Sequence, residues 1–149
     1  MYGPDLQDRL KAWASGLVGG DVAVEIGRSE ALPRQMGGRF VSIGTPEADL
    51  EVGQFGSGDN RYNVVWSIPI DVSSFGSEYD PRSAYGSSYE LLQLLMNSVA
   101  DDDLQLPATN WTTIDGYSTK TEYTDETKAM VLTLNLSVNT IGWNSSDSA

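Results

Sequence analysis

The cleanest alternation of apolar and polar residues in this 149-residue chain, over positions 128–140, constrains its fold more than any other feature. Successive side chains of a β-strand point to opposite faces of the sheet, so a period of two indicates a strand with one buried face. Residues 62–72 show the same period, with aromatic and β-branched residues at every second position. The two segments therefore predict a sheet that packs one of its faces against a core. In the C-terminal segment that face consists of Met130, Leu132, Leu134, Leu136 and Val138.

The remaining elements follow from shorter patterns. Apolar stripes at helical spacing predict one helix over residues 4–15 and another over about 88–100, the second capped by Ser87 or Ser88. Apolar and β-branched runs predict further strands, and the strand before 61–72 forms a hairpin with it. These further strands are 22–26, 39–43, 50–55 and 111–124. We predict one α+β domain over residues 1–149, of order α-β-β-β-β-α-β-β, in which two helices pack on a mainly antiparallel sheet and a short flexible tail starts at about 144.

Several positions are expected to interrupt the regular elements. Pro69 cannot donate a hydrogen bond to a neighbouring strand, which predicts an edge or a bulge at that point. Gly116 predicts a second bulge, in the strand over 111–124. Residues 44–49 have the composition of a turn, and residues 73–86 read as a long polar loop with three aromatic residues.

The composition excludes most of the common sets of catalytic residues. The chain contains no Cys and no His, so it has no disulfide, no thiolate or imidazole metal ligand, and no catalytic triad based on either residue. The run at residues 101–103 is the one dense carboxylate cluster, and adjacent carboxylates do not converge on one ion as alternating loop positions do. We therefore expect a solvated helix end there, no metal, no cofactor and no catalytic residue.

The charge balance is strongly acidic. Nine Lys and Arg stand against 21 Asp and Glu, a net charge of −12. Such a chain repels nucleic-acid phosphates instead of neutralising them. An acidic, lysine-poor composition suits a salt-rich cytoplasm, where self-repulsion is screened, so we expect a halophilic host, with an ordinary acidic mesophilic protein as the alternative. The sequence has no apolar run long enough to span a bilayer and its N-terminus lacks signal-peptide character, which predicts a soluble, intracellular product.

Two segments contain residue types that anchor protein interfaces. The first is the expected loop 73–86, in which Phe75, Tyr79, Arg82 and Tyr85 are the candidates. In the second, two of the few cations flank an apolar side chain and a glycine pair, and carboxylates of a neighbouring copy are natural partners for them. Its candidates are Arg34, Met36 and Arg39. The alternative for both segments is a surface loop folded onto its own domain.

The C-terminal third resembles the last hairpin of the tail terminator proteins of long-tailed phages. The resemblance rests on residues 116–117, 122–126 and 129–138, and on the order of elements before them. It implies a virion structural protein without catalytic activity. Copies form a ring, usually a hexamer, that caps the tail tube and joins it to the head-neck complex. The implied partners are the tail tube protein and the neck or head-completion (stopper) protein, while genome DNA passes through without specific binding and no membrane is involved.

Under this resemblance, the tip over 119–127 is a candidate for contact along the tail axis, through Thr119, Lys120, Glu122 and Asp125. The expected location is the tail or neck of the virion, and the host cytoplasm during assembly. Three alternatives stay open from the sequence. They are another neck, tail-completion or tube-like subunit, a small soluble ligand-binding module, and an enzyme that uses carboxylates alone.

Overall fold

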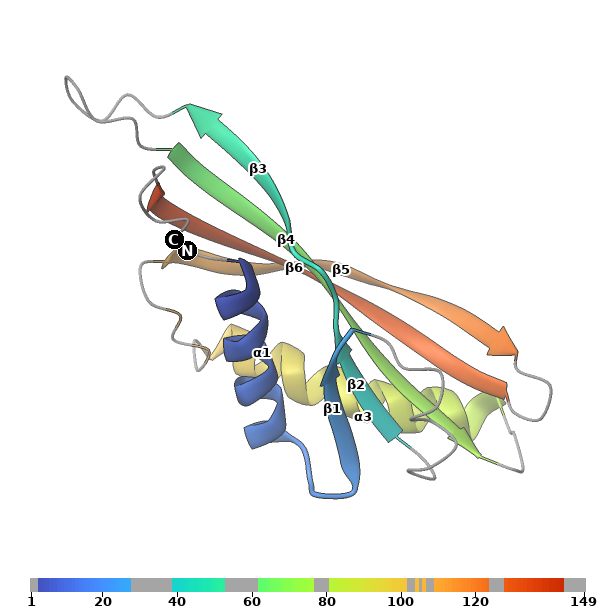
Figure 1. The fold of residues 1–149 in the computed structure, drawn as a ribbon. Coiled ribbons are helices and arrows are strands. Elements are labelled where there is room, and N and C mark those ends of the chain that lie inside the picture. Colours follow the sequence, from blue (N-terminus) through green and yellow to red (C-terminus); the bar gives the residue numbers. More distant parts are fainter. Residues whose placement is uncertain are drawn as a thin grey trace.

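The computed structural model describes residues 3–27, 39–52, 62–76, 81–101, 104, 106, 109–123 and 128–143. Its elements follow the predicted order α-β-β-β-β-α-β-β, which confirms the α+β class (Figure 1). They are α1 (Gly3–Leu17), β1 (Val22–Ile26), β2 (Arg39–Ile43), β3 (Glu47–Val52), β4 (Tyr62–Gly76), α3 (Pro81–Ala100), β5 (Thr109–Tyr123) and β6 (Lys128–Trp143).

The six strands form one sheet of order β1-β2-β4-β6-β5, in which β3 also pairs with β4. All pairs are antiparallel except β1 with β2. β4 therefore has β6 along one side, and along the other side first β3 and then β2 (Figure 1). The prediction of a mainly antiparallel sheet is confirmed.

Pro69 lies where β4 changes its neighbour. β3 pairs with β4 up to Ser67 and β2 pairs with it from Ile70, so Pro69 falls between the two ladders. Its carbonyl accepts a hydrogen bond from the Gly44 N–H at 2.8 Å, at the end of β2. The prediction of an edge strand or a bulge at Pro69 was wrong, because β4 is an interior strand and the break lies in its partner.

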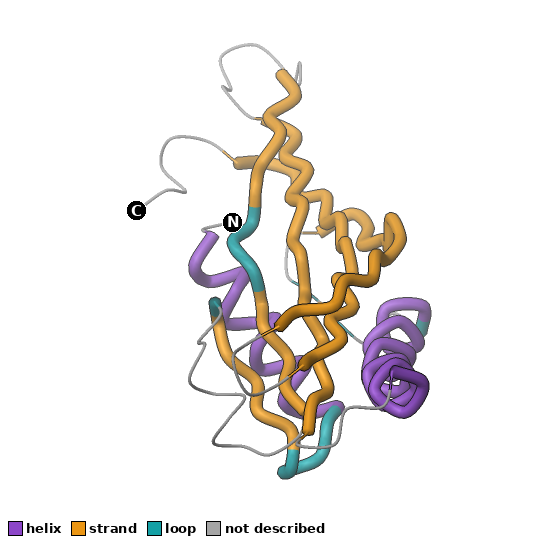
Figure 2. The backbone as a smooth tube through the Cα atoms, turned by 90° about the vertical axis from the view of Figure 1, so that its right-hand side faces the viewer, coloured by secondary structure: helices purple, strands orange, loops and turns teal. Residues whose placement is uncertain are grey.

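The core lies between one face of the sheet and both helices. Even-numbered residues of β4 and β6 line this face, and Leu132, Leu134 and Leu136 are completely buried. From the other side, α1 contributes Leu6 and Leu10, and α3 contributes its leucine stripe. Figure 2 shows the strands as a twisted layer beside the helices, with α3 seen nearly end on. The helix-facing side of the sheet is therefore the apolar one that the alternation predicted.

The largest departure from prediction concerns residues 73–86. β4 continues to Gly76 and α3 begins at Pro81, so the expected loop reduces to 77–80, which lie outside the described residues. Ser87 and Ser88 both lie inside α3, so the prediction that one of them is its N-cap was wrong, and Ser88 is completely buried. Proline suits a first helical position because its missing N–H would have no partner there. Gly86 and the serines around it lower intrinsic helix propensity, and this conceals the first two turns in the sequence.

Smaller boundaries also differ. β3 begins at Glu47, inside the expected turn over 44–49, because pairing with β4 holds it extended. The bulge predicted at Gly116 is confirmed: the β5–β6 register shifts between Ile114 and Gly116, and Gly116 has φ 147°.

Candidate interaction surfaces

The predicted interface residues fall into three groups. Arg34, Met36, Tyr79 and Asp125 lie outside the described residues. Phe75 lies in β4, and Lys120 and Glu122 lie in β5, so these residues of the expected loop and tip belong to regular strands. The structure describes the side chains of the other four, and it places Arg82 and Tyr85 on α3 instead of on a loop. These four are Arg39, Arg82, Tyr85 and Thr119.

Arg39, at the start of β2, lies beside the surface of α3. Its guanidinium Nη2 lies 3.2 Å from Oδ2 of Asp21, which precedes β1. The Arg39 side chain is 29% exposed and that of Asp21 is 70% exposed, so this ion pair is a solvent-screened one that contributes little to stability. Arg39 also lines a pocket of about 370 Å³. The other lining residues are Gly19, Glu90, Leu91, Gln93, Leu94 and Asn97, most of them from α3.

Three tyrosines from α3 and β5 form a second feature, which we call the tyrosine cluster: Tyr85, Tyr89 and Tyr117. Tyr85 and Tyr89 stack with ring centroids 5.8 Å apart, and Tyr89 meets Tyr117 edge to face at 6.3 Å. The hydroxyls of Tyr85 and Tyr117 are hydrogen-bonded at 3.2 Å. This bond, together with the charge that Tyr85 carries when ionised, raises the pKa of Tyr117 above its ordinary value.

Sequence reasoning singled out Tyr85 but missed Tyr89 as an interface residue. The signal was present, because positions 85 and 89 are four residues apart and share one side of a helix. It became readable only when residues 81–87 were known to be helical.

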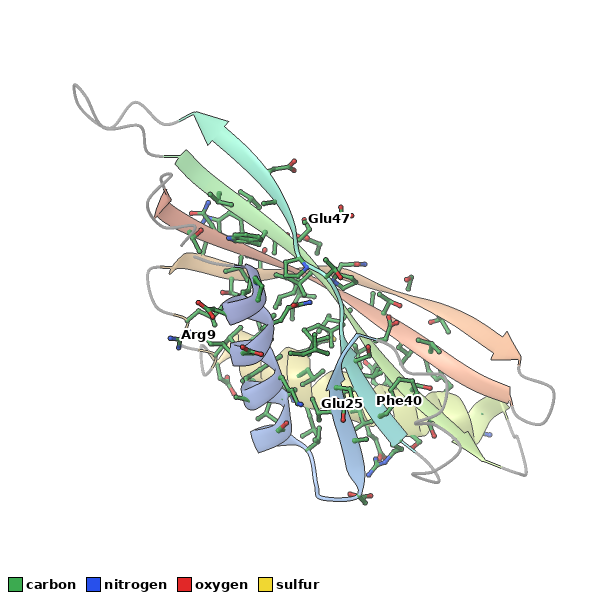
Figure 3. All side chains as sticks on the ribbon, in the orientation of Figure 1. Arg9, Glu25, Phe40 and Glu47 are labelled. Carbon is green, nitrogen blue, oxygen red and sulfur yellow. The ribbon has the colours of Figure 1, made fainter. Side chains whose placement is uncertain are left out.

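The sheet face turned away from the helices is acidic; we call it the open face. Of the side chains that the structure describes on it, five are carboxylates and none is Lys or Arg. The strand register places Glu51, Lys120 and Glu122 at further positions of the same face. Thr133 Oγ1 donates to Asp71 Oδ1 at 2.6 Å, and the Ser137 hydroxyl donates to the Asp115 carboxylate. These bonds hold two carboxylates against the sheet surface. The five are Glu25, Glu47, Asp49, Asp71 and Asp115, and Figure 3 labels Glu25 and Glu47.

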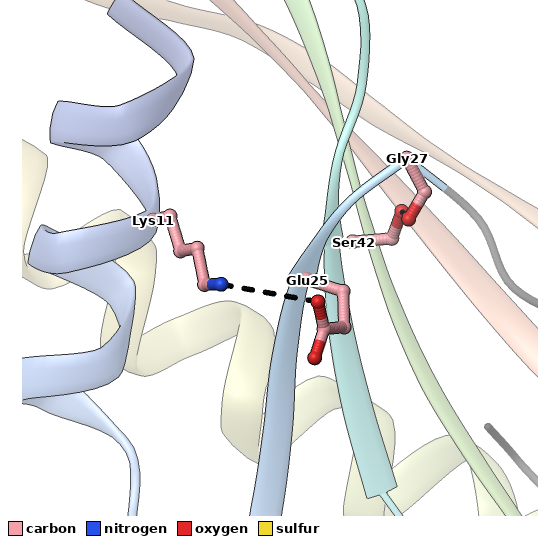
Figure 4. A network of polar contacts seen from close by, with 4 residues as sticks. All are labelled: Lys11, Glu25, Gly27 and Ser42. Atoms are coloured by element: carbon pink, nitrogen blue, oxygen red, sulfur yellow. Dashed lines mark hydrogen bonds and ion pairs between the residues drawn. The ribbon is translucent and has the colours of Figure 1, made fainter. Parts of the chain in front are cut away.

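At its β1 edge the open face receives one cation from outside the sheet. Lys11 Nζ of α1 lies 3.8 Å from Glu25 Oε2, while the Ser42 hydroxyl on β2 donates to the carbonyl of Gly27 at 2.9 Å (Figure 4). Both side chains of the ion pair are more than two fifths exposed, so the pair is screened and weak. The rest of the described open face has no such compensation.

The described part of the chain offers little for other chemistry. Its Asp and Glu residues form no group of three that could hold a metal ion. Asp101 is exposed at the end of α3, and residues 102–103 of the acidic run lie outside the described residues. None of the helices that the structure describes is long and apolar enough to cross a membrane.

The fold, with two helices on one face of this six-stranded sheet, is similar to that of a sheath/tube terminator. Among solved structures, the chain is similar to the sheath/tube terminator of an extracellular contractile injection system, PVC, in its extended state, with a TM-score of 0.50 and 14% identity. The match covers 95% of this chain and 58% of the PVC chain, so the protein spans little more than half the length of that terminator. It is also similar to a chain from the virion of a native gene transfer agent particle, with a TM-score of 0.49, 16% identity and 90% of each chain covered. No protein-family model and no curated protein sequence matches.

Proposed function

We propose that this protein is a tail terminator, a virion structural subunit that ends a tail tube. The observation that carries the proposal is the fold itself, which follows that of a sheath/tube terminator along 95% of this chain. The C-terminal strands that suggested tail terminators in the sequence are β5 and β6 of this fold. In this proposal the protein acts by shape and self-association and catalyses no reaction.

The proposed working form is a closed ring, a hexamer, made by identical head-to-tail contacts between copies. One side of the ring binds the last ring of tail tube subunits and the other receives the neck or stopper protein. The protein would then be located in the tail or neck of the virion, and in the host cytoplasm during assembly. The candidates for contact between copies remain the segment that contains Arg34, Met36 and Arg39 and the segment 73–86. The candidate for contact along the tail axis remains the tip over 119–127.

The open face suits the inner wall of such a ring. Genome DNA must pass through without being held, and the five described carboxylates of this face carry the same sign as the DNA phosphates. Screening limits this repulsion to about 8 Å at physiological ionic strength and to shorter distances at higher salt, so it acts close to the wall. In this orientation the helices lie on the outside of the ring.

The test is microscopy and a tube-length assay. Negative-stain images of the purified protein should show rings with a central hole. Adding the protein to growing tubes of a tail tube protein should stop elongation and leave a cap at one end. Protein that builds into the tube wall as further rings would instead indicate a tube-like subunit. A monomer that leaves tube length unchanged would overturn the proposal.

A further inference from the structure

The tyrosine cluster is an exposed aromatic surface that its own contacts hold in place. Tyr85, Tyr89 and Tyr117 are 38%, 36% and 41% exposed, and they are three of the six large apolar side chains that are this exposed in the described part of the chain. Tyrosine is among the residues that dominate interface energetics. Because stacking and the hydroxyl contact already order these rings, a partner would lose little conformational freedom in binding them.

Charge is sparse and of both signs around the cluster, on a chain of net charge −12. Gly86 and Thr119, two exposed neighbours of the cluster in α3 and β5, are uncharged. In α3, Arg82 lies three residues before Tyr85 and Glu90 directly follows Tyr89, so one charge of each sign flanks the cluster along this helix. A basic partner would be attracted to the carboxylates of the open face. A second copy of the same acidic chain meets less repulsion at the cluster, where an arginine offsets one carboxylate, than at the open face with its five described carboxylates.

The pocket beside Arg39 has the complementary character. The pocket lies where α3 meets Arg39 of β2, whereas the cluster lies where α3 meets Tyr117 of β5, and Leu94 in the pocket is 46% exposed. Leu91 and Leu94 supply apolar walls, and Asn97 and the Glu90 carboxylate are hydrogen-bonding groups that a phenol could reach. Pockets of about 300 Å³ and above hold drug-sized ligands, so a volume near 370 Å³ admits an aromatic ring. Glu90, which also lines the pocket, has a charge opposite to that of Arg82.

We infer that the tyrosine cluster of one copy docks in the pocket of the next copy, with Arg82 facing Glu90 across the contact. The inference rests on the proposed function, because it assigns the contact that closes the ring. The two surfaces consist of different residues, so the contact is heterologous and repeats from copy to copy. It brings the predicted residues Arg82 and Tyr85 to one side of the interface and Arg39 to the other.

The test uses sedimentation velocity on the full chain, with circular dichroism to confirm folding. Wild type should sediment as a ring, whereas Tyr89→Asp and Leu94→Asp should each sediment as single chains. An equimolar mixture of the two variants should form dimers and nothing larger, because each variant keeps one intact surface. Tyr85→Phe, which retains the ring and loses the hydroxyl, serves as the matched control and should still assemble.

Charge reversal gives a second arm. Arg82→Glu and Glu90→Arg should each weaken assembly at least tenfold at low salt, and the double variant should recover most of the loss. If either aspartate variant does not fold, a mixture of Tyr89→Cys and Leu94→Cys chains replaces it. Because the native chain has no Cys, a disulfide-linked dimer of these chains reports the contact directly. Rings that persist in both aspartate variants, or single-cysteine chains that do not cross-link, would overturn this interface. Such rings would still cap tubes if the proposed function holds, whereas a wild-type monomer without capping activity would remove both proposals.

Discussion

Trp13 and Ser98 connect the two helices. The indole Nε1 of Trp13 on α1 donates a hydrogen bond of 2.8 Å to the Ser98 Oγ on α3, and Ser98 is 4% exposed. The two residues are 85 positions apart in the chain. This bond ties the N-terminal helix to the helix that carries both proposed contact surfaces.

Removing the donor of this bond should destabilise the protein. In Trp13→Phe the buried Ser98 hydroxyl loses its partner, and we expect the free energy of unfolding to fall by about 1–3 kcal/mol, measured by urea denaturation. Ser98→Ala, which removes the orphaned hydroxyl as well, completes a double-mutant cycle. A coupling energy near zero between the two positions would show that the bond adds nothing.

The sheet-facing side of α3 should be far more sensitive than its outer side. Leu92 is completely buried in the main core, and Leu92→Ala should cost about 2–5 kcal/mol because it leaves a cavity. The neighbouring Gln93 is exposed, and Gln93→Ala should change the stability by less than about 0.5 kcal/mol. Similar denaturation midpoints for both variants would contradict the placement of α3.

Two glycines should respond in opposite directions to the same substitution. Gly116→Ala should destabilise by about 1–3 kcal/mol, because φ 147° is a conformation that side chains rarely adopt. Gly16→Ala should stabilise by up to about 1 kcal/mol, because Gly16 lies within α1 with open space around its Cβ position. Thermal unfolding of the two variants beside wild type measures both effects.

Salt should stabilise the fold. A net charge of −12 opposes compaction, and screening relieves it. We expect the unfolding midpoint to rise from low to molar NaCl. The exposed pairs Lys11–Glu25 and Arg39–Asp21 weaken in the same range, but such pairs contribute at most about 1 kcal/mol each. A midpoint that does not rise with salt would favour the ordinary mesophilic alternative.

Titration of the tyrosines should report the Tyr85–Tyr117 contact. The raised pKa of Tyr117 means that the folded state holds this proton more tightly than the unfolded state. The stability linked to it is complete below the ordinary pKa of tyrosine and is lost as the pH rises through the higher folded value. Absorbance at alkaline pH should show one phenol titrating late, and Tyr117→Phe should remove that component. An unchanged titration curve in this variant would exclude the contact.

The local patterns of the chain were sufficient for most of the architecture. The alternation over 128–140 defined β6 and its buried face, the leucine stripe located the C-terminal half of α3, and Gly116 marked the bulge in β5. These features are readable because hydrophobic periodicity and glycine geometry depend on a residue and its near neighbours. The same local reading failed at 81–87, where weak helix formers make a helix that tertiary packing stabilises.

The interaction surfaces depended on long-range placement. The sequence by itself determined that the chain is acidic, has no Cys or His, and builds two helices on a largely antiparallel sheet. The tertiary structure alone brought Tyr117 of β5 against Tyr85 and Tyr89, set Arg39 beside the outer surface of α3, and left the carboxylates of several strands on one open face. The physical reason is that strand register and helix docking are decided by burial of the whole core, and no local window of the sequence contains that information.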